Sequence, residues 1–305
     1  MALQEIRRFD SDFKVWHSGY TNMTFLAHWH DELELIYIRQ GSAVIYMDNQ
    51  PYYAESGDLL LCPGGCIHYC NSMDRKNQLD FVIFDVGLIQ SRISPIHLPA
   101  RLVRYEQLQK FGLSHEVHHV FYLLPKELKE HSLYYEEIVK STLRILCYKL
   151  QRIFEQEEIP THGKNSNEEA WMQQILHYMN QHISDEITLE KVALQANLSQ
   201  CYLSRIFKKY TGMNFVQYRN RLRLEQAIEL LHNTTNPIAE IAYECGFQDV
   251  RTFNRVFQQY TGHNPSAFRK NPQLLNYVVA YPHRKGGACL LVENDSPVVH
   301  QNLNI

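Results

Sequence analysis

Short apolar runs, separated by turn-forming residues, dominate the first hundred residues. Four of these runs are Leu33–Ile38, Ala43–Met47, Asp58–Cys62 and Leu79–Val86, with glycine, Asp or Asn between them. Runs of this length at close spacing are typical of antiparallel strands. We therefore expect a small β-sandwich or β-barrel at the N-terminus.

The apolar spacing changes to a helical one between about residues 126 and 158. A stripe with 4-3-4-3 spacing marks one helix face, and it consists of Val139, Leu143, Leu146, Leu150 and Ile153. Such a stripe either packs on the barrel of its own chain or forms the seam of a dimer. The sequence leaves both interpretations open.

A polar stretch with Pro and Gly at residues 157–167 is typical of an interdomain linker. Residues 168–270 are then almost wholly helical in pattern. The predicted fold class is multidomain α+β: a barrel over 1–125, a helical dimerisation or linker region over 126–158, and an all-α domain over 168–270. The tail 271–305 contains two strand-like runs and has no predicted role.

The strongest signal is an internal repeat. Residues 201–219 match residues 251–269 at an offset of 50, and upstream of them the offset is 49. Each copy predicts a helix, a tight turn and a second helix, with Asn197 and Gly246 at the turns, where positive φ is required. The matched positions include Arg205 with Arg255, Phe207 with Phe257, Tyr210-Thr211-Gly212 with Tyr260-Thr261-Gly262, Asn214 with Asn264, and Arg219 with Arg269.

The repeat predicts two helix-turn-helix units, whose second helices can enter a DNA major groove. Residues 214–231 between them predict one helix about 27 Å long. That length is close to the ~34 Å between successive major-groove faces. A rigid spacer of this length could place both recognition helices on one side of a duplex.

This region closely resembles the DNA-binding domain of the AraC/XylS family, on residues 202–212, 221–231 and 238–269. The resemblance implies two units that read adjacent major grooves of double-stranded DNA near a promoter, with RNA polymerase as a further partner. It also implies the base-reading positions, which in this chain are Gln200, Cys201, Ser204, Arg205, Val250, Arg251, Asn254 and Arg255.

The overall charge of −3 does not mark a nucleic-acid binder, so the local distribution decides. No acidic residue lies between Ser199 and Arg223, whereas six basic ones do: Arg205, Lys208, Lys209, Arg219, Arg221 and Arg223. Such a cluster suits phosphate contacts. Because the second copy has Gln258-Gln259 in place of Lys208-Lys209, we expect Arg205→Ala to weaken operator binding more than Arg255→Ala.

The N-terminal region resembles the two cupin motifs through His28, His30, Glu34 and His68. One interpretation is a divalent metal site formed by these four residues, since imidazole and carboxylate suit Zn, Fe or Mn. The preferred one is a ligand pocket without a cofactor. By analogy with the family, its effector is a carbohydrate, and its predicted residues are His28, His30, Glu34, Tyr37, Tyr46 and His68.

Three classes of protein fit these features. The first, which we expect, is a non-enzymatic transcription regulator controlled by a small molecule. The others are a metal-dependent cupin enzyme fused to a DNA-binding domain, and a DNA-binding protein whose barrel only dimerises. Because no secretory signal, long apolar run or CxxC pair occurs, we expect a cytoplasmic protein with free thiols and no membrane partner. We also expect a homodimer, for which the helical region 126–158 is the candidate.

Overall fold

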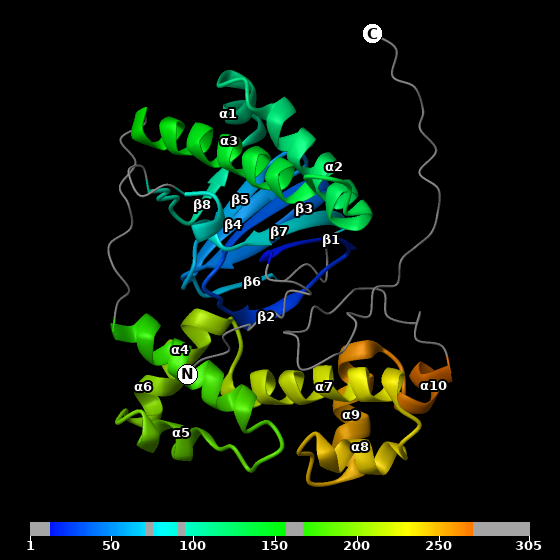
Figure 1. The fold of residues 1–305 in the computed structure, drawn as a ribbon. Helices are drawn as coiled ribbons and strands as arrows, with labels where there is room; N and C mark the ends of the chain where they lie inside the picture. The colour runs from blue at the N-terminus through cyan, green and yellow to red at the C-terminus, as the bar shows by residue number, and fades with distance from the viewer. Residues whose placement is uncertain (1–12, 71–75, 91–94, 157–166, 271–305) are drawn as a thin grey trace.

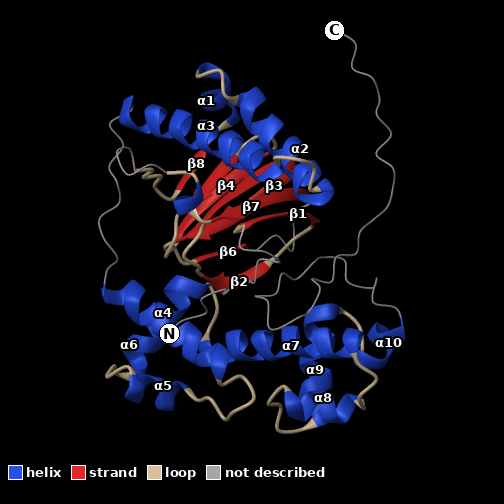
Figure 2. Cartoon of the chain, in the orientation of Figure 1, coloured by secondary structure: helices blue, strands red, loops and turns tan. Residues whose placement is uncertain are grey.

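The computed structural model describes residues 13–70, 76–90, 95–156 and 167–270. A strand-rich N-terminal part lies between a helical layer and a second, all-helical part, as Figures 1 and 2 show. The predicted combination of a sheet-rich domain and a helical C-terminal domain is confirmed. The strands are β1 (Val15–Thr21), β2 (Phe25–His28), β3 (Leu33–Met47), β4 (Gln50–Glu55), β5 (Leu59–Cys62), β6 (His68–Cys70), β7 (Asn77–Phe84) and β8 (Arg101–Val103).

The long strand β3 organises the sheet. It pairs with β7 and β5 through its first half and with β4 and β6 through its second. A β-bulge between Ile38 and Gln40 interrupts its pairing with β7. Gly41 follows at φ +80°, where a Cβ would collide with the carbonyl oxygen of Lys76. The sequence predicts a break at this glycine, but the strand bends there and continues, as bulged strands do.

The helices begin at Tyr105, earlier than the predicted boundary at residue 126. They are α1 (Tyr105–Lys110), α2 (Ser114–Glu130), α3 (Tyr135–Gln156), α4 (Asn167–Gln181), α5 (Leu189–Gln195), α6 (Gln200–Thr211), α7 (Phe215–Asn233), α8 (Ile238–Glu244), α9 (Val250–Thr261) and α10 (Pro265–Lys270). The predicted linker falls almost wholly, and the 271–305 tail entirely, outside the described residues.

The apolar stripe of α3 packs on the barrel of its own chain. All five of its residues are buried in one cluster with the outward-facing side chains of β3, β5 and β7, such as Leu35, Leu61 and Val82. The alternative, in which these side chains form a dimer seam, is wrong because they have no surface left for a partner.

None of the helices in the described ranges is long and apolar enough to cross a bilayer.

Three apolar clusters form the core. The first joins the inner face of the barrel to the helices α4 to α7, so that Ile36 and Phe207 belong to one continuous core. The second lies between the outer face of the sheet and α1 to α3. The third, around Phe253 and Phe257, holds the end of α7 together with α8, α9 and α10. The first helix-turn-helix unit therefore shares its core with the barrel, whereas the second has a core of its own.

Candidate nucleic-acid interface and effector site

The two repeats fold into matching helix-turn-helix units because the repeated residues make matching caps. Thr211 Oγ1 donates to the Phe207 carbonyl at 2.8 Å, and Thr261 Oγ1 donates to the Phe257 carbonyl at 2.8 Å. Gly212 and Gly262 end the helices α6 and α9 at φ +69° and +74°. The repeated Tyr-Thr-Gly sequence thus ends each second helix at the same point. Asn197 and Gly246 have positive φ at the turns, as predicted.

The exposed faces of α6 and α9 present equivalent positions, at which Arg205 and Arg255 are the shared side chain. The structure places the exposed predicted DNA-binding residues on these two faces: Gln200, Cys201, Ser204, Arg205, Lys208 and Lys209 on α6, and Arg251, Asn254 and Arg255 on α9. Val250 differs, since it is partly buried against the core of the second unit. Arg and Asn side chains on an exposed helix face are suited to guanine and adenine contacts.

Glu168 of α4 binds two side chains of α6. Its carboxylate accepts hydrogen bonds from Lys209 at 2.6 Å and from the Tyr202 hydroxyl at 2.8 Å, and these two bonds hold the pKa of Glu168 below its ordinary value. The guanidinium of Arg205 lies over the Tyr202 ring, 5.1 Å from its centroid. Arg205 is therefore oriented before any DNA arrives, while Lys209 already has an acidic partner.

The basic cluster predicted to contact phosphates is only partly available. Arg221 and Arg223 are buried, and Arg219 donates to the Ile187 carbonyl at 2.8 Å. Arg223 donates to the carbonyls of Ile183 and Asp185 at 3.0 and 2.7 Å. For Arg221 and Arg223 the phosphate prediction is wrong, because helix α7 turns both side chains into the protein interior. Arg219 is half-buried, and its guanidinium already has a main-chain partner.

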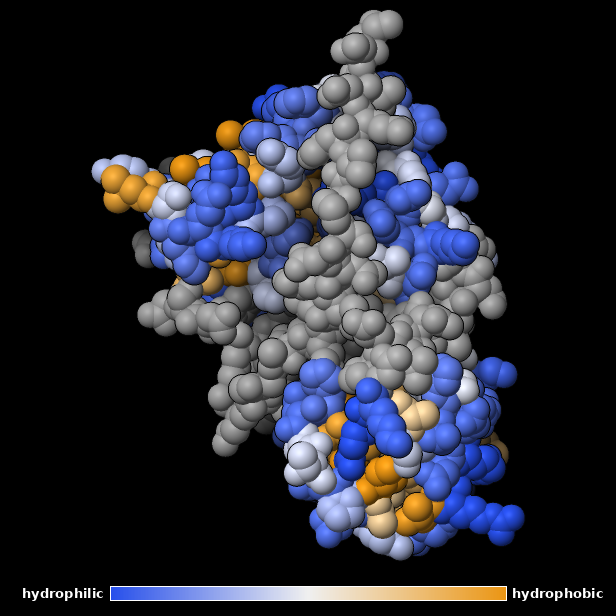
Figure 3. Space-filling view, turned by 90° about the vertical axis from the view of Figure 1, so that its right-hand side faces the viewer, coloured by the Kyte–Doolittle hydropathy of each residue, from blue (hydrophilic) through white to orange (hydrophobic). Residues whose placement is uncertain are grey.

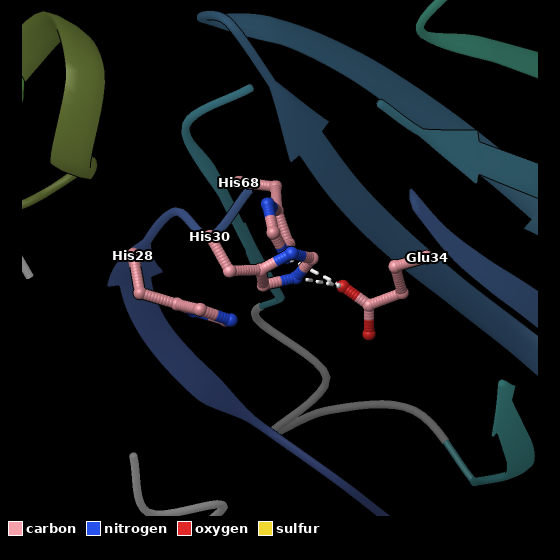
Figure 4. Close-up of side chains that lie close together, drawn as sticks. All are labelled: His28, His30, Glu34 and His68. Atoms are coloured by element: carbon pink, nitrogen blue, oxygen red, sulfur yellow. Dashed lines mark hydrogen bonds and ion pairs between the residues drawn. The ribbon is translucent and has the colours of Figure 1, made fainter. Parts of the chain in front are cut away.

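Three imidazoles surround one carboxylate inside the barrel (Figure 4). Glu34 Oε2 lies 3.1 Å from His30 Nε2 and 2.7 Å from His68 Nε2. His28 completes the group, and one ligand atom from each residue lies within 4.8 Å of all the others. Burial would raise the pKa of Glu34, but the charge of His68 and hydrogen bonds from His30 and His68 hold it well below its ordinary value.

The structure does not bring Tyr37 and Tyr46 to this group. Tyr37 lies on the opposite face of β3, stacked on Phe121 of α2 with 5.1 Å between ring centroids. Tyr46 stacks on Tyr69 at 4.5 Å, and both rings line a cavity on the side of the first helix-turn-helix unit. The six predicted ligand-binding residues therefore occupy three different places.

Comparisons with known proteins cover both parts of the chain. Residues 12–143 match the model of the AraC-like ligand binding domain, and residues 192–271 match a helix-turn-helix domain model. The chain belongs to the AraC family of transcription regulators. It has the ligand-binding domain of that family at its N-terminus and the DNA-binding domain at its C-terminus.

Known proteins match either most of this chain or about one third of it. It is 26% identical to the HTH-type transcriptional activator RhaR of Mannheimia succiniciproducens, over 80% of this chain and 87% of that protein. It is 40% identical to the regulatory protein PocR of Salmonella typhimurium, over 32% of this chain and 33% of that one. Among solved structures, the C-terminal domain of the response regulator AraT from Geobacillus stearothermophilus is 34% identical, with a TM-score of 0.33, and the match covers 34% of this chain and 88% of that one.

In this AraC-family chain the barrel contacts the first helix-turn-helix unit and the helices α4 and α7 that flank it. The Tyr218 hydroxyl donates to the Ala27 carbonyl at 2.8 Å, and Gln173 Nε2 donates to the Gly65 carbonyl at 2.7 Å. A Cβ at Gly212 would lie 2.7 Å from the hydroxyl oxygen of Tyr69, so the Tyr69 ring abuts this turn. At the equivalent Gly262, no described atom lies within 4 Å of such a Cβ.

These contact residues were not predicted from the sequence. Tyr69 follows the predicted His68, and period-two alternation along a strand would have placed it on the other face. Tyr218 and Gln173 lie on helices whose apolar spacing gave no sign of a partner beyond their own domain. A cavity of about 140 Å³ lies at this contact, and its lining includes Thr24, Tyr46, Tyr69, Met213 and Arg221.

Proposed function

We propose that this AraC-family regulator reads its operator with α6 and α9 and responds to a small molecule bound between the barrel and the first helix-turn-helix unit. The observation that carries the proposal is the equivalence of Arg205 and Arg255, exposed at matching positions of two helices that end at equivalent glycines. The proposal places the chain in the cytoplasm, with promoter DNA and RNA polymerase as its partners.

Selection of bound duplexes from a random library, followed by footprinting, tests the DNA-binding part. The expected footprint has two protected segments about one helical turn apart, since α7 spans roughly 28 Å. One protected segment, or protection without sequence preference, would contradict the use of both units.

For the effector we propose a carbohydrate bound in the interdomain cavity. Its volume of about 140 Å³ is close to that of an engineered cavity of about 150 Å³ that takes up benzene, so it accommodates one six-membered ring. Tyr46 and Tyr69 offer aromatic surface, and Thr24 and Arg221 offer polar atoms, which is the usual composition of a ligand pocket. A molecule there touches both domains at once.

Calorimetric titration of the full chain with a panel of mono- and disaccharides should detect binding of at least one sugar. Tyr46→Ala should weaken that binding about 10-fold, the contribution of one aromatic contact of about 1–1.5 kcal/mol. The matched control is Tyr53→Ala on β4, because Tyr53 is exposed and lies outside the cavity. If no sugar gives a binding signal, the proposed carbohydrate effector is wrong, whereas the proposed DNA binding is unaffected.

We also propose a homodimer, formed through the outward face of α3 rather than through its buried stripe. Ile138 and Ile145 lie seven residues apart on one helix face and remain exposed, Ile145 by 55%. Figure 3 shows hydrophobic groups among the hydrophilic ones over the helical layer at the top of the molecule.

Sedimentation equilibrium should find a dimer for the wild type and a monomer for Ile145→Asp, because an unpaired charge would then have to be buried in the interface. Leu194→Asp is the control, since Leu194 is an exposed apolar residue on α5, away from α3. A dimer that persists in Ile145→Asp would exclude this face.

A further inference from the structure

Helix α4 brings an acidic residue to the face of α6 that we propose reads DNA. Glu168 lies in the first turn of α4, and its carboxylate accepts from Lys209 Nζ at 2.6 Å and from the Tyr202 hydroxyl at 2.8 Å. Lys209 follows Arg205 by about one helical turn, so the two side chains are neighbours on one face of α6. A cation next to the proposed base-reading arginine is therefore already paired with a carboxylate of the same chain.

This ion pair is charged at neutral pH, and both of its members are held by a second contact. The hydrogen bond between them holds the pKa of Glu168 below its ordinary value and raises the pKa of Lys209. Exposed ion pairs are usually weak, because two long side chains lose conformational freedom when they meet. Here the Tyr202 hydroxyl fixes Glu168, and Lys209 Nζ lies over the Tyr210 ring, 5.0 Å from its centroid. Less freedom is therefore lost when this pair forms.

The second helix-turn-helix unit differs at both of the α6 positions involved. Gln259 is equivalent to Lys209, and it has no charge for a carboxylate to bind. Thr252 is equivalent to Tyr202, and its Oγ1 donates to the helix cap Asp249 at 2.9 Å. The ion pair therefore belongs to the unit whose core continues into the barrel.

We propose that Glu168 is an autoinhibitory contact, which keeps Lys209 away from the DNA phosphates and so limits the affinity of the first unit. A lysine that contacts a phosphate releases counterions from DNA, whereas a lysine that stays paired with a carboxylate does not. When Glu168 releases Lys209, the first unit gains one phosphate contact. This inference rests on the proposed reading of DNA by α6.

The barrel is linked to this contact through α4. Further along the same helix, Gln173 Nε2 donates to the Gly65 carbonyl of the barrel at 2.7 Å. Met172 and Ile175 of α4 are buried in the core that the barrel shares with the first unit. A change in the barrel that shifts α4 therefore also shifts Glu168 relative to Lys209. In this way the barrel sets how much of the first unit's affinity is available.

The variant Glu168→Gln tests the contact, because it removes the charge but keeps an oxygen that accepts from the Tyr202 hydroxyl. The full chain is titrated with the selected operator at several salt concentrations. The variant should bind on the order of fivefold more tightly at about 0.15 M salt. The slope of log affinity against log salt should become steeper by about 0.9, the value for one added phosphate contact.

A double-mutant cycle separates this contact from a general effect of charge. In the Lys209→Ala background, Glu168→Gln should change neither the affinity nor the slope. Glu190→Gln is the charge control, since it removes one negative charge from an exposed position on α5, and it should leave the slope unchanged. Thermal unfolding checks that each variant is folded. A gain in affinity that persists without Lys209, or an unchanged slope in Glu168→Gln, would overturn the autoinhibitory contact.

The link to the barrel has its own variant. Gln173→Ala should raise the affinity in the same direction but by less, about twofold, because the apolar core still holds α4. Its control is Gln174→Ala, at the exposed neighbouring position of the same helix. No change in Gln173→Ala would overturn the link alone. Arg205→Ala is measured in parallel: if it binds the operator as tightly as the wild type, the reading of DNA by α6 fails, and the inference fails with it.

Discussion

Arg205→Ala is expected to weaken operator binding about 10–100-fold, and Arg255→Ala to weaken it less. A bidentate contact from Arg to guanine contributes about 1–3 kcal/mol, and each 1.4 kcal/mol is a factor of ten. Arg205 is oriented by the Tyr202 ring, which Glu168 holds in turn. The residue equivalent to Tyr202 in the second unit is Thr252, which offers no aromatic surface to Arg255.

Contacts to the DNA phosphate backbone should also make the first unit bind more strongly than the second. Lys208 is exposed on α6, whereas its equivalent Gln258 donates to the Gly262 carbonyl at 2.7 Å. The measurement is a fluorescence anisotropy titration of the selected operator at fixed salt, because phosphate contacts make affinity depend on salt. Gln195→Ala, at an exposed polar position on α5, should leave the affinity unchanged. Equal losses for the two arginine variants would refute the ranking.

The sequence predicted the DNA-binding domain well because its information is local and repeated. Caps, turns and apolar spacing all lie within about ten residues of one another, and two copies confirm each assignment. The positions of Asn197, Gly212 and Gly246 follow from their need for positive φ. The roles of Arg221 and Arg223 were not predictable in this way, since only the packing of α7 decides that they face inward.

At the effector site, the alternation of side chains along β3 was not enough to predict which residues lie on the same face as Glu34. Period-two alternation already separates Tyr37 from Glu34, and this signal could have excluded Tyr37 from the site. The same alternation places Tyr46 with Glu34, but the bulge between Ile38 and Gln40 reverses the faces, so Ala43 and Ile45 point inward instead. A bulge inserts one residue without an apolar signature, so no pattern of apolar positions reveals it.

The two helix-turn-helix units should differ in how far the loss of a buried ring spreads through the protein. Phe207→Ala and Phe257→Ala remove equivalent, fully buried rings, and each should cost about 3–5 kcal/mol. Phe207 packs on Phe215 and Tyr218 in the core that continues into the barrel, whereas Phe257 packs on Phe253 and Phe268 in the separate core of the second unit. The first loss should therefore reach the barrel and the second should remain local.

Native-state hydrogen exchange followed by mass spectrometry separates these outcomes, because it reports local opening segment by segment. Phe207→Ala should reduce protection in α6, in the first half of α7 and also in β2 and β6, whereas Phe257→Ala should reduce it only in the end of α7 and in α8 to α10. Phe207→Leu, which keeps most of the apolar volume, should show a smaller loss over the same segments. Full barrel protection in Phe207→Ala would mean that the shared core does not couple the domains, and a signal from the barrel could not then reach DNA through the first unit.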